Sequence, residues 1–167
     1  MSAFRNLPSL SLSEDLWDET PPDPLAEPGY YDGLLWRRVF GFAVDVVLVW
    51  GVNIGLLILT ILSLGLLWPI LVVVSPVLPL AYHTYFLGRN GATPGMALFD
   101  VELRAWDGRP LDYLQAFLQT ALFYATMALT GGLVLIVSLF NDRRRTLHDI
   151  LSGSIAVRHD YLRAALP

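Results

Sequence analysis

The chain contains no cysteine and no lysine, and only 16% of its residues are charged. Without cysteine it has neither a disulfide framework nor a thiolate metal site. Soluble proteins carry about 25% charged residues, so this chain is short of groups that face water. It has long apolar runs instead: 54% of its residues are hydrophobic and the mean hydropathy is +0.52. These features exclude a chain that is disordered throughout and indicate a protein embedded in lipid.

The 167 residues suffice for one domain, and their charges are unevenly distributed. Residues 1–33 carry seven acids, one base and five prolines, a composition that disfavours both helix and core. They also lack the basic start and apolar centre of a signal peptide. We therefore expect a disordered acidic N-terminal tail at 1–33, a transmembrane domain at 34–158 and a C-terminal tail at 159–167.

The apolar run at residues 39–87 is too long for one crossing, because about 20 helical residues span the hydrocarbon of a bilayer. The segment from Gly65 to Pro69 offers a break: proline suits the first turn of a helix, and the neighbouring tryptophan favours the membrane interface. We predict two long transmembrane helices, at about 36–62 and 69–87.

Arginines flank this hairpin and are missing from its link. Arg37 and Arg38 precede the first helix, and Arg89, Arg104 and Arg109 follow the second. An excess of arginine marks the cytoplasmic side of a membrane. The pattern predicts a multi-pass protein of the bacterial inner membrane, with a cytoplasmic N-terminus and both hairpin ends cytoplasmic. Its main partner would be the lipid bilayer, and nucleic acid is not expected.

Residues 88–112 form a polar connector. Within it, residues 99–105 alternate apolar and polar side chains, as a short strand does, and Asp107-Gly108 would close a tight turn after it. Residues 154–158 read as a second short strand. The predicted fold class is an all-α membrane protein that carries a small two-stranded cytoplasmic element.

A third apolar segment occupies residues 114–140. A single crossing would place the arginines at 143–145 outside, against the positive-inside rule. Gly131-Gly132 offers a break at which the chain turns back, which would make the segment a shallow hairpin covered by other helices. Both alternatives remain open, and we favour the hairpin with both ends cytoplasmic.

Asp45 is the most informative residue, because it lies inside the first predicted helix among apolar neighbours. A carboxylate at such depth costs about 2.5–3.5 kcal/mol on insertion scales, so it must be paired, hydrated or protonated. Arg38 lies seven residues earlier, on the same side of the helix and about 10 Å away along its axis, within range to lean toward the carboxylate. The pair is either structural, fixing helix packing, or part of transport chemistry.

Other polar and small residues are secondary candidates. Gly51 and Gly55 form a small-xxx-small pair that we expect to pack against the second helix, and Asn53 is a candidate interhelical hydrogen bonder. His83 lies near the cytoplasmic end of the second helix, where it would relay protons or make an interfacial hydrogen bond.

The arginine run at 143–145 suits anionic headgroups, through Arg144 and Arg145 in particular. His148 and Asp149 follow on a short stretch with an apolar stripe, and Asp149 is expected to be the ionised partner of an arginine. Neither residue has the spacing of a metal site, so we expect no metal and no cofactor.

Three short segments follow one another at fitting distances. They are Trp36–Asp45, with Arg38 and Asp45; Gly91–Gly95, with Thr93, leading into Val101–Pro110; and Arg144–Asp149, followed by Gly153–Val157. Together they resemble the RDD family of bacterial membrane proteins, named for one arginine and two aspartates. The resemblance covers about residues 34–158 and implies that Arg38, Asp45 and Asp149 are the name-giving residues.

The chain departs from the family pattern at two positions. Met96 stands where the family usually has lysine, and Gln119 stands roughly where many members place an arginine. The resemblance implies transport, with cation/proton exchange attributed to some members, while others are accessory subunits of membrane assemblies. It leaves the role of this chain open.

The sequence therefore leaves two functions open for this chain. In the first, the chain is a small transporter or transport-associated subunit: Asp45 takes up a proton or cation, Arg38 sets its pKa, and Asp149 pairs with an arginine at the cytoplasmic mouth. That role would need a homo-oligomer or a membrane-protein partner. In the second, the same residues form a static polar clasp in a structural or assembly factor. An enzyme is not expected, because the sequence offers no nucleophile–base pair.

Overall fold

The computed structural model describes residues 17, 20–131 and 142–159. Most of them are helical, with one small sheet, as the sequence predicts. The elements are, in chain order, η1 (Pro28–Tyr30), α1 (Leu34–Leu62), α2 (Trp68–Asn90), α3 (Pro94–Leu98), β1 (Val101–Ala105), α4 (Tyr113–Thr130), α5 (Leu147–Ser152) and β2 (Ser154–Arg158).

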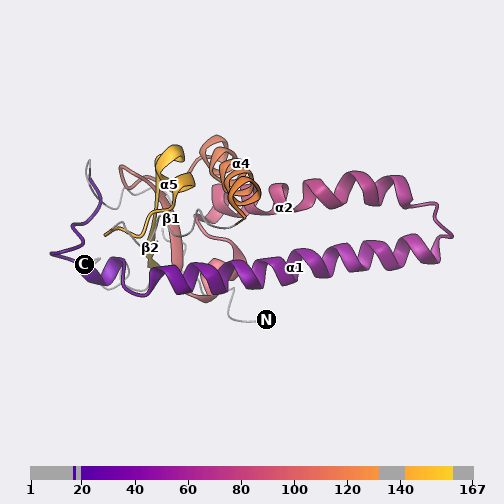
Figure 1. Ribbon diagram of the computed structural model, residues 1–167, viewed down its shortest axis with the longest axis horizontal. Helices are drawn as coiled ribbons and strands as arrows, with labels where there is room; N and C mark the ends of the chain where they lie inside the picture. Colours follow the sequence, from indigo (N-terminus) through magenta and orange to yellow (C-terminus); the bar gives the residue numbers. More distant parts are fainter. Residues whose placement is uncertain (1–16, 18–19, 132–141, 160–167) are drawn as a thin grey trace.

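Helices α1 and α2 form a long hairpin, and the other elements gather at one end of it (Figure 1). The predicted bounds of both helices agree with the structure to within three residues. Two segments, Pro28–Leu62 and Trp68–Asn90, are long and apolar enough to cross a membrane. Between residues 46 and 81 the hairpin has no charged side chain, and most of its large apolar side chains are exposed, as expected of helices whose surroundings are lipid.

The two predicted strands pair in an antiparallel sheet in which Leu103 lies opposite Ala156. The small β element is thus confirmed. Its burial differs from the alternation in the sequence, because α1 and α3 cover β1 and leave Glu102 and Arg104 only 2% and 1% exposed. The two buried charges lie 2.6 Å apart, from Glu102 Oε1 to Arg104 Nε. His159 approaches the other carboxylate oxygen through Nδ1 at 2.7 Å.

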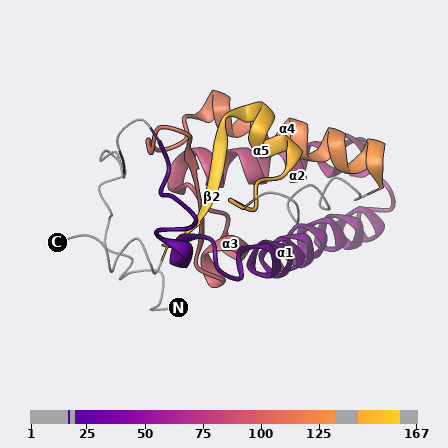
Figure 2. The ribbon, with the colours of Figure 1, turned by 60° about the vertical axis from the view of Figure 1, so that its left-hand side comes forward.

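Helix α4 forms the first part of the third apolar segment. Asp112 caps its N-terminus by accepting a 2.6 Å hydrogen bond from the amide of Gln115, and it ends where Gly131 adopts a left-handed φ of 58°. It packs against α2 and α5, and Figure 2 shows it beside them, with α3 lying next to α1. Among the described residues α4 does not qualify as a membrane span. The choice between crossing and hairpin falls on residues 132–141, outside the described part of the chain.

Several described residues before position 34 pack against the rest of the structure. Tyr30 and Tyr31 are buried in the core, and the Tyr31 hydroxyl donates to the carbonyl of Pro22 over 2.9 Å. Trp17 donates its indole N–H to the carbonyl of Trp106, also over 2.9 Å. These three aromatic side chains pack in or against the hydrophobic core. Residues 1–16, 18–19 and 160–167 lie outside the described residues.

Candidate functional site

The elements α3, β1, α4, α5 and β2 at the end of the hairpin are called the small domain below. Asp45 lies on the face of α1 that meets it, with 1% of its surface exposed. Its carboxylate accepts three hydrogen bonds. Oδ1 accepts from the hydroxyl of Tyr82 at 2.7 Å and from the amide of Gly95 at 2.8 Å, and Oδ2 accepts from the hydroxyl of Thr93 at 2.5 Å. The carboxylate is therefore satisfied by α2 and by the start of α3.

The first turn of α3 is shaped to receive this carboxylate. Thr93 is the N-cap of the helix: its hydroxyl accepts the amide of Met96 at 3.2 Å and so donates its proton to Asp45. Gly95 has no room for a side chain, since a Cβ there would collide with the carbonyl oxygen of Gly41 and lie 2.8 Å from Oδ1 of Asp45. The Thr-x-Gly sequence thus lets α3 approach α1 backbone to backbone.

Arg38 and Asp149 form the second polar centre. Nη1 and Nη2 of the guanidinium donate to Oδ2 and Oδ1 of the carboxylate over 2.5 Å and 2.9 Å. The Asp149 side chain has no exposed surface and that of Arg38 has 16%. This two-pronged geometry is the strong form of an arginine–carboxylate contact. It fastens α5 to the first turns of α1.

Asp149 also accepts hydrogen bonds from neutral groups. Oδ2 accepts from the amide and the hydroxyl of Thr146 at 2.9 Å and 2.7 Å, and Oδ1 accepts from Nε2 of Gln119 at 2.7 Å. Burial alone would raise the pKa of this carboxyl, but the Arg38 charge and the hydrogen bonds outweigh it and hold the pKa well below its usual range. Asp149 is therefore ionised, as the sequence predicted, although its arginine partner comes from α1.

The predicted Arg38–Asp45 pair is not formed. Both residues lie on the same side of α1 and border one cavity, in agreement with their spacing. The guanidinium binds Asp149 instead, and Asp45 is satisfied by Tyr82, Thr93 and Gly95. Tertiary packing brings these partners into direct hydrogen-bonding distance of Arg38 and Asp45. The two residues, one heptad apart on α1, therefore bind them and not each other.

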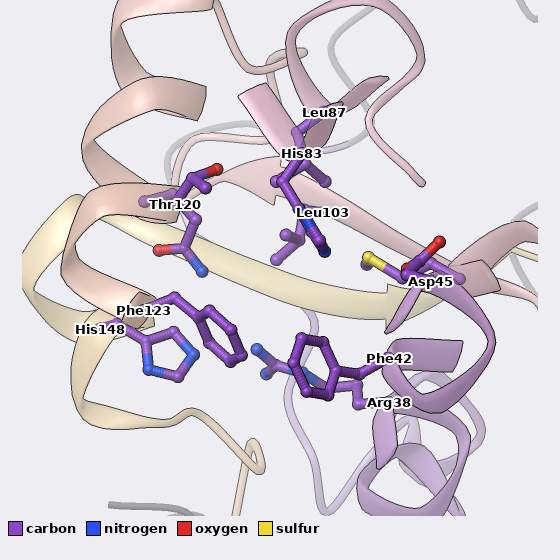
Figure 3. Close-up of a pocket in the computed structure, with 11 residues that line it drawn as sticks. Arg38, Phe42, Asp45, His83, Leu87, Leu103, Thr120, Phe123 and His148 are labelled. Carbon is purple, nitrogen blue, oxygen red and sulfur yellow. The ribbon is translucent and has the colours of Figure 1, made fainter. Parts of the chain in front are cut away.

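The cavity between the two polar centres has a volume of about 70 Å³, which is room for several water molecules. Its lining residues are Arg38, Phe42, Asp45, His83, Leu87, Met96, Leu103, Gln119, Thr120, Phe123 and His148. Figure 3 shows His83, Phe123 and Arg38 directed toward the same space from different elements, with His148 beside Phe123.

The two histidines of the cavity each have one nitrogen bonded and one without a partner among the described residues. His83 uses Nδ1, 2.9 Å from the carbonyl of Pro79, and His148 uses Nε2, 2.7 Å from the hydroxyl of Thr146. His83 Nε2 and His148 Nδ1 are buried and unpaired. Burial and the nearby Arg38 lower the pKa of His148 to about 4 despite the opposing effect of Asp149, so its ring is neutral at pH 7.

The remaining arginines of the predicted site serve the small domain. Arg37 donates to the carbonyl of Phe99 at 2.9 Å, and Arg145 donates to the carbonyls of Ser154 and Asp149, both at 3.0 Å. Arg145 also lies 4.4 Å from the ring centre of Trp106. Arg144 lies in the turn before α5 with a left-handed φ of 51°.

Two secondary predictions about α1 are wrong. Asn53 donates to the carbonyl of Val49 in its own helix, at 2.9 Å, and not across to α2. A Cβ at Gly51 or Gly55 would find no atom within 4 Å in the described structure. In the described structure the small-residue face therefore makes no packing contact with α2.

Three residues of the site were not predicted from the sequence. Tyr82 and Thr146 carried no signal of their own, because a hydroxyl beside a buried carboxylate is recognised only once the carboxylate has been placed. Gln119 was singled out only as a departure from the family pattern. Gln119 is 3% exposed and links α4 to α5. Its side chain donates a hydrogen bond to Asp149 and accepts one from the hydroxyl of Ser152 at 2.5 Å.

The comparison with known families agrees with this geometry. The model of the RDD family matches residues 33–153. The chain belongs to the RDD family. The matched region includes both polar centres and the cavity, and the arginine and two aspartates of this RDD chain all lie at the domain end of its hairpin. Searches among curated proteins and among solved structures find no match.

Proposed function

We propose that this RDD protein is a structural or assembly component of a membrane complex, in which Arg38, Asp45 and Asp149 form a static polar clasp. One observation carries the proposal: each of the three groups is bound by at least one partner that lies 37 or more residues away in the chain. The clasp holds α3 and α5 against α1, so that the small domain has a fixed position at the end of the hairpin. The proposed role is non-enzymatic.

The distribution of charge along the hairpin supports this role over transport by one chain. Asp45 is the last charged residue before the link, and residues 46–62 extend for about 25 Å as a helix without an ionisable group. A proton or cation that left Asp45 would meet no relay in that part of α1. Proton-conducting membrane proteins rely on chains of such groups.

The arginines suggest the orientation. Arg37 and Arg38 begin α1, Arg89 ends α2, and the link at residues 63–67 is uncharged. By the positive-inside rule the small domain faces the cytoplasm. We therefore place the protein in the bacterial inner membrane, multi-pass, with a cytoplasmic N-terminus. The exposed apolar faces of α1 and α2 would contact lipid, a second copy or another membrane protein.

Transport-associated work is the second candidate, because the cavity reaches Asp45. In that reading the cavity admits a cation or proton to the carboxylate, and a partner or a second copy supplies the rest of the path. Cation/proton exchange would then be the reaction. It requires Asp45 to exchange its hydrogen-bond donors for the transported ion.

Replacement of Asp45 by asparagine separates the two candidates. The amide would present N–H groups to the donors of Thr93 or Gly95, so the clasp predicts a loss of about 1.5–3 kcal/mol in the free energy of unfolding. It also predicts that vesicles containing the wild-type protein show no cation-driven proton flux. Unfolding in detergent and fluorescence of a pH dye in vesicles measure the two quantities.

Asp107→Asn is the matched control, because Asp107 lies in an exposed turn and its ion pair in the described structure is with Arg109, two residues later. It should leave stability unchanged. Flux in wild-type vesicles that disappears in Asp45→Asn, with an unchanged unfolding transition, would establish transport and refute the clasp. A photoreactive residue can also replace the exposed Trp50. If it forms adducts with lipid only, that result contradicts the assembly role.

A further inference from the structure

Two histidines, His83 and His148, present nitrogen lone pairs to the cavity between the two polar centres. In His83, Nδ1 lies 2.9 Å from the carbonyl oxygen of Pro79 and 3.2 Å from the hydroxyl of Tyr124. A carbonyl only accepts hydrogen bonds, so Nδ1 carries the proton. In the neutral ring Nε2 is then an acceptor, and it is the nitrogen that lacks a partner in the described structure.

His148 has the opposite tautomer and also presents a lone pair to the cavity. The hydroxyl of Thr146 donates its one proton to Oδ2 of Asp149, so it accepts from Nε2–H of His148 at 2.7 Å. Nδ1 of the neutral ring is therefore the second lone pair, and it too is buried without a partner. His148 is 1% exposed and His83 is 8% exposed. An unpaired buried polar atom is costly, so both nitrogens require a donor.

The charge of Arg38 is already balanced. Nη1 and Nη2 of its guanidinium bind Asp149, and Nε2 of Gln119 is directed to the same carboxylate. An anion in the cavity would therefore meet an ion pair rather than a free cation, and it would also face two imidazole lone pairs. The lining thus disfavours phosphate and carboxylate groups as occupants.

The charges favour a cation. Asp149 neutralises Arg38, which leaves the Asp45 carboxylate as the uncompensated charge of the lining. Asp45 accepts three hydrogen bonds, and a carboxylate has about four acceptor positions. The rings of Phe42 and Phe123, whose centres lie 5.0 Å apart, also border the cavity and offer π faces that attract cations.

A metal ion does not fit this set. The described residues contain no group of three or more His, Cys, Asp or Glu side chains placed to hold one. A sodium or potassium ion prefers oxygen ligands, and the free groups here are imidazole nitrogens. The occupant that matches lone pairs, negative charge and aromatic faces is a small cation that carries its own N–H donors.

We propose that the cavity lined by His83, His148 and Asp45 binds a primary ammonium group. The ammonium donates hydrogen bonds to the two free imidazole nitrogens, and its charge is balanced by Asp45. Two sources supply this chemistry at the end of a membrane hairpin: a small soluble amine, and the ethanolamine headgroup of a phospholipid. The site is independent of the proposed assembly role, because a rigid clasp keeps the cavity open whether or not the protein has partners.

Nitrogen NMR of the imidazole rings tests the proposal directly, since the chain has three histidines. The full-length protein, labelled with 15N-histidine, is placed at pH 7 in nanodiscs of phosphatidylcholine and titrated with methylammonium. We expect a saturable shift of His83 Nε2 and His148 Nδ1. His159 lies on the sheet with Nδ1 at Glu102, and its signals should stay constant as an internal reference.

Tetramethylammonium is the matched control ligand, because it has the same charge and no N–H donor. It should give no saturable shift, and this comparison needs no variant that risks misfolding. His83→Phe should weaken methylammonium binding about tenfold, the loss expected for one hydrogen bond to a charged group. Equal responses to the two cations would refute a site that recognises N–H donors.

Nanodiscs of phosphatidylethanolamine, without added amine, identify the source. Shifted His83 and His148 signals in that lipid, which added methylammonium no longer changes, would assign the occupant as the headgroup. Unshifted signals that still respond to methylammonium would assign it as a soluble amine. The absence of a saturable shift in both experiments would mean that the cavity holds only water, and would overturn the proposal.

Discussion

Arg38 and Asp149 are 111 residues apart in the chain and meet through two parallel hydrogen bonds of 2.5 Å and 2.9 Å. The first comes from the second turn of α1, and the second from α5, just before the final strand. Their contact closes the domain from its first long helix to its last helix. All the other residues that line the cavity lie between Arg38 and Asp149 in the sequence.

Removal of one member of this pair should destabilise the fold strongly. Arg38→Ala leaves the buried Asp149 carboxylate without its charged partner, and such losses cost about 3–5 kcal/mol. Chemical unfolding in detergent measures the effect. Arg109→Ala is the control, because its ion pair with Asp107 is largely exposed and should contribute about 0–1 kcal/mol. Similar losses in the two variants would show that the Arg38 contact has no special role.

The close approach of α3 to α1 should depend on Gly95. In Gly95→Ala the new methyl group collides with Gly41 and displaces the amide that binds Asp45, for an expected loss of about 1–3 kcal/mol. Gly55→Ala is the matched substitution in open space on α1 and should be neutral or slightly stabilising. Unfolding midpoints of both variants test this difference, and an unaffected Gly95→Ala would contradict the observed approach.

Acid should destabilise the protein through His148. Its pKa is about 4 in the folded protein against 6.5 for the free side chain, so the unfolded chain binds more protons between these values. Stability must then fall as the pH drops from about 6.5 to 4, by up to about 3 kcal/mol. Asp149, whose pKa is lowered by folding, adds a loss at still lower pH. Unfolding free energies between pH 4 and 8 should show a smaller slope in His148→Gln, and an unchanged slope would refute the assignment.

The proposed orientation can be read from introduced cysteines, because the natural chain has none. Leu66 lies in the link, with 79% of its surface exposed, and Asp107 lies in a turn of the small domain. An impermeant maleimide applied to intact cells should label Leu66→Cys, whereas Asp107→Cys should react only after lysis. The reverse pattern would place the small domain outside the cell.

The sequence predicted the hairpin and both strands well, because these elements follow from properties that neighbouring residues share. Long apolar runs make helices in lipid, and the uncharged link marks their turn. Alternating side chains predicted a strand at residues 99–105, of which 101–105 form one, but did not predict that Glu102 and Arg104 are both buried. That depends on which elements cover the strand.

The site was predicted in its members and not in its contacts. Arg38, Asp45 and Asp149 stand out because ionisable groups in apolar surroundings need partners. Helix periodicity predicted a contact between Arg38 and Asp45. In the structure Asp45 binds Gly95 and Thr93 instead, and Arg38 binds Asp149. Asn53, likewise, met its hydrogen-bonding need within its own helix.

By itself, the sequence determined that this chain forms a long apolar hairpin and which three charges must be neutralised at its end, since hydropathy and charge act locally along the chain. Only the tertiary structure decided how they are neutralised. A buried charge takes the partners that folding brings to it, and for Asp45 and Arg38 those came from α2, α3 and α5. The same packing left two imidazole nitrogens facing a cavity, which no pattern of residues along the chain could have specified.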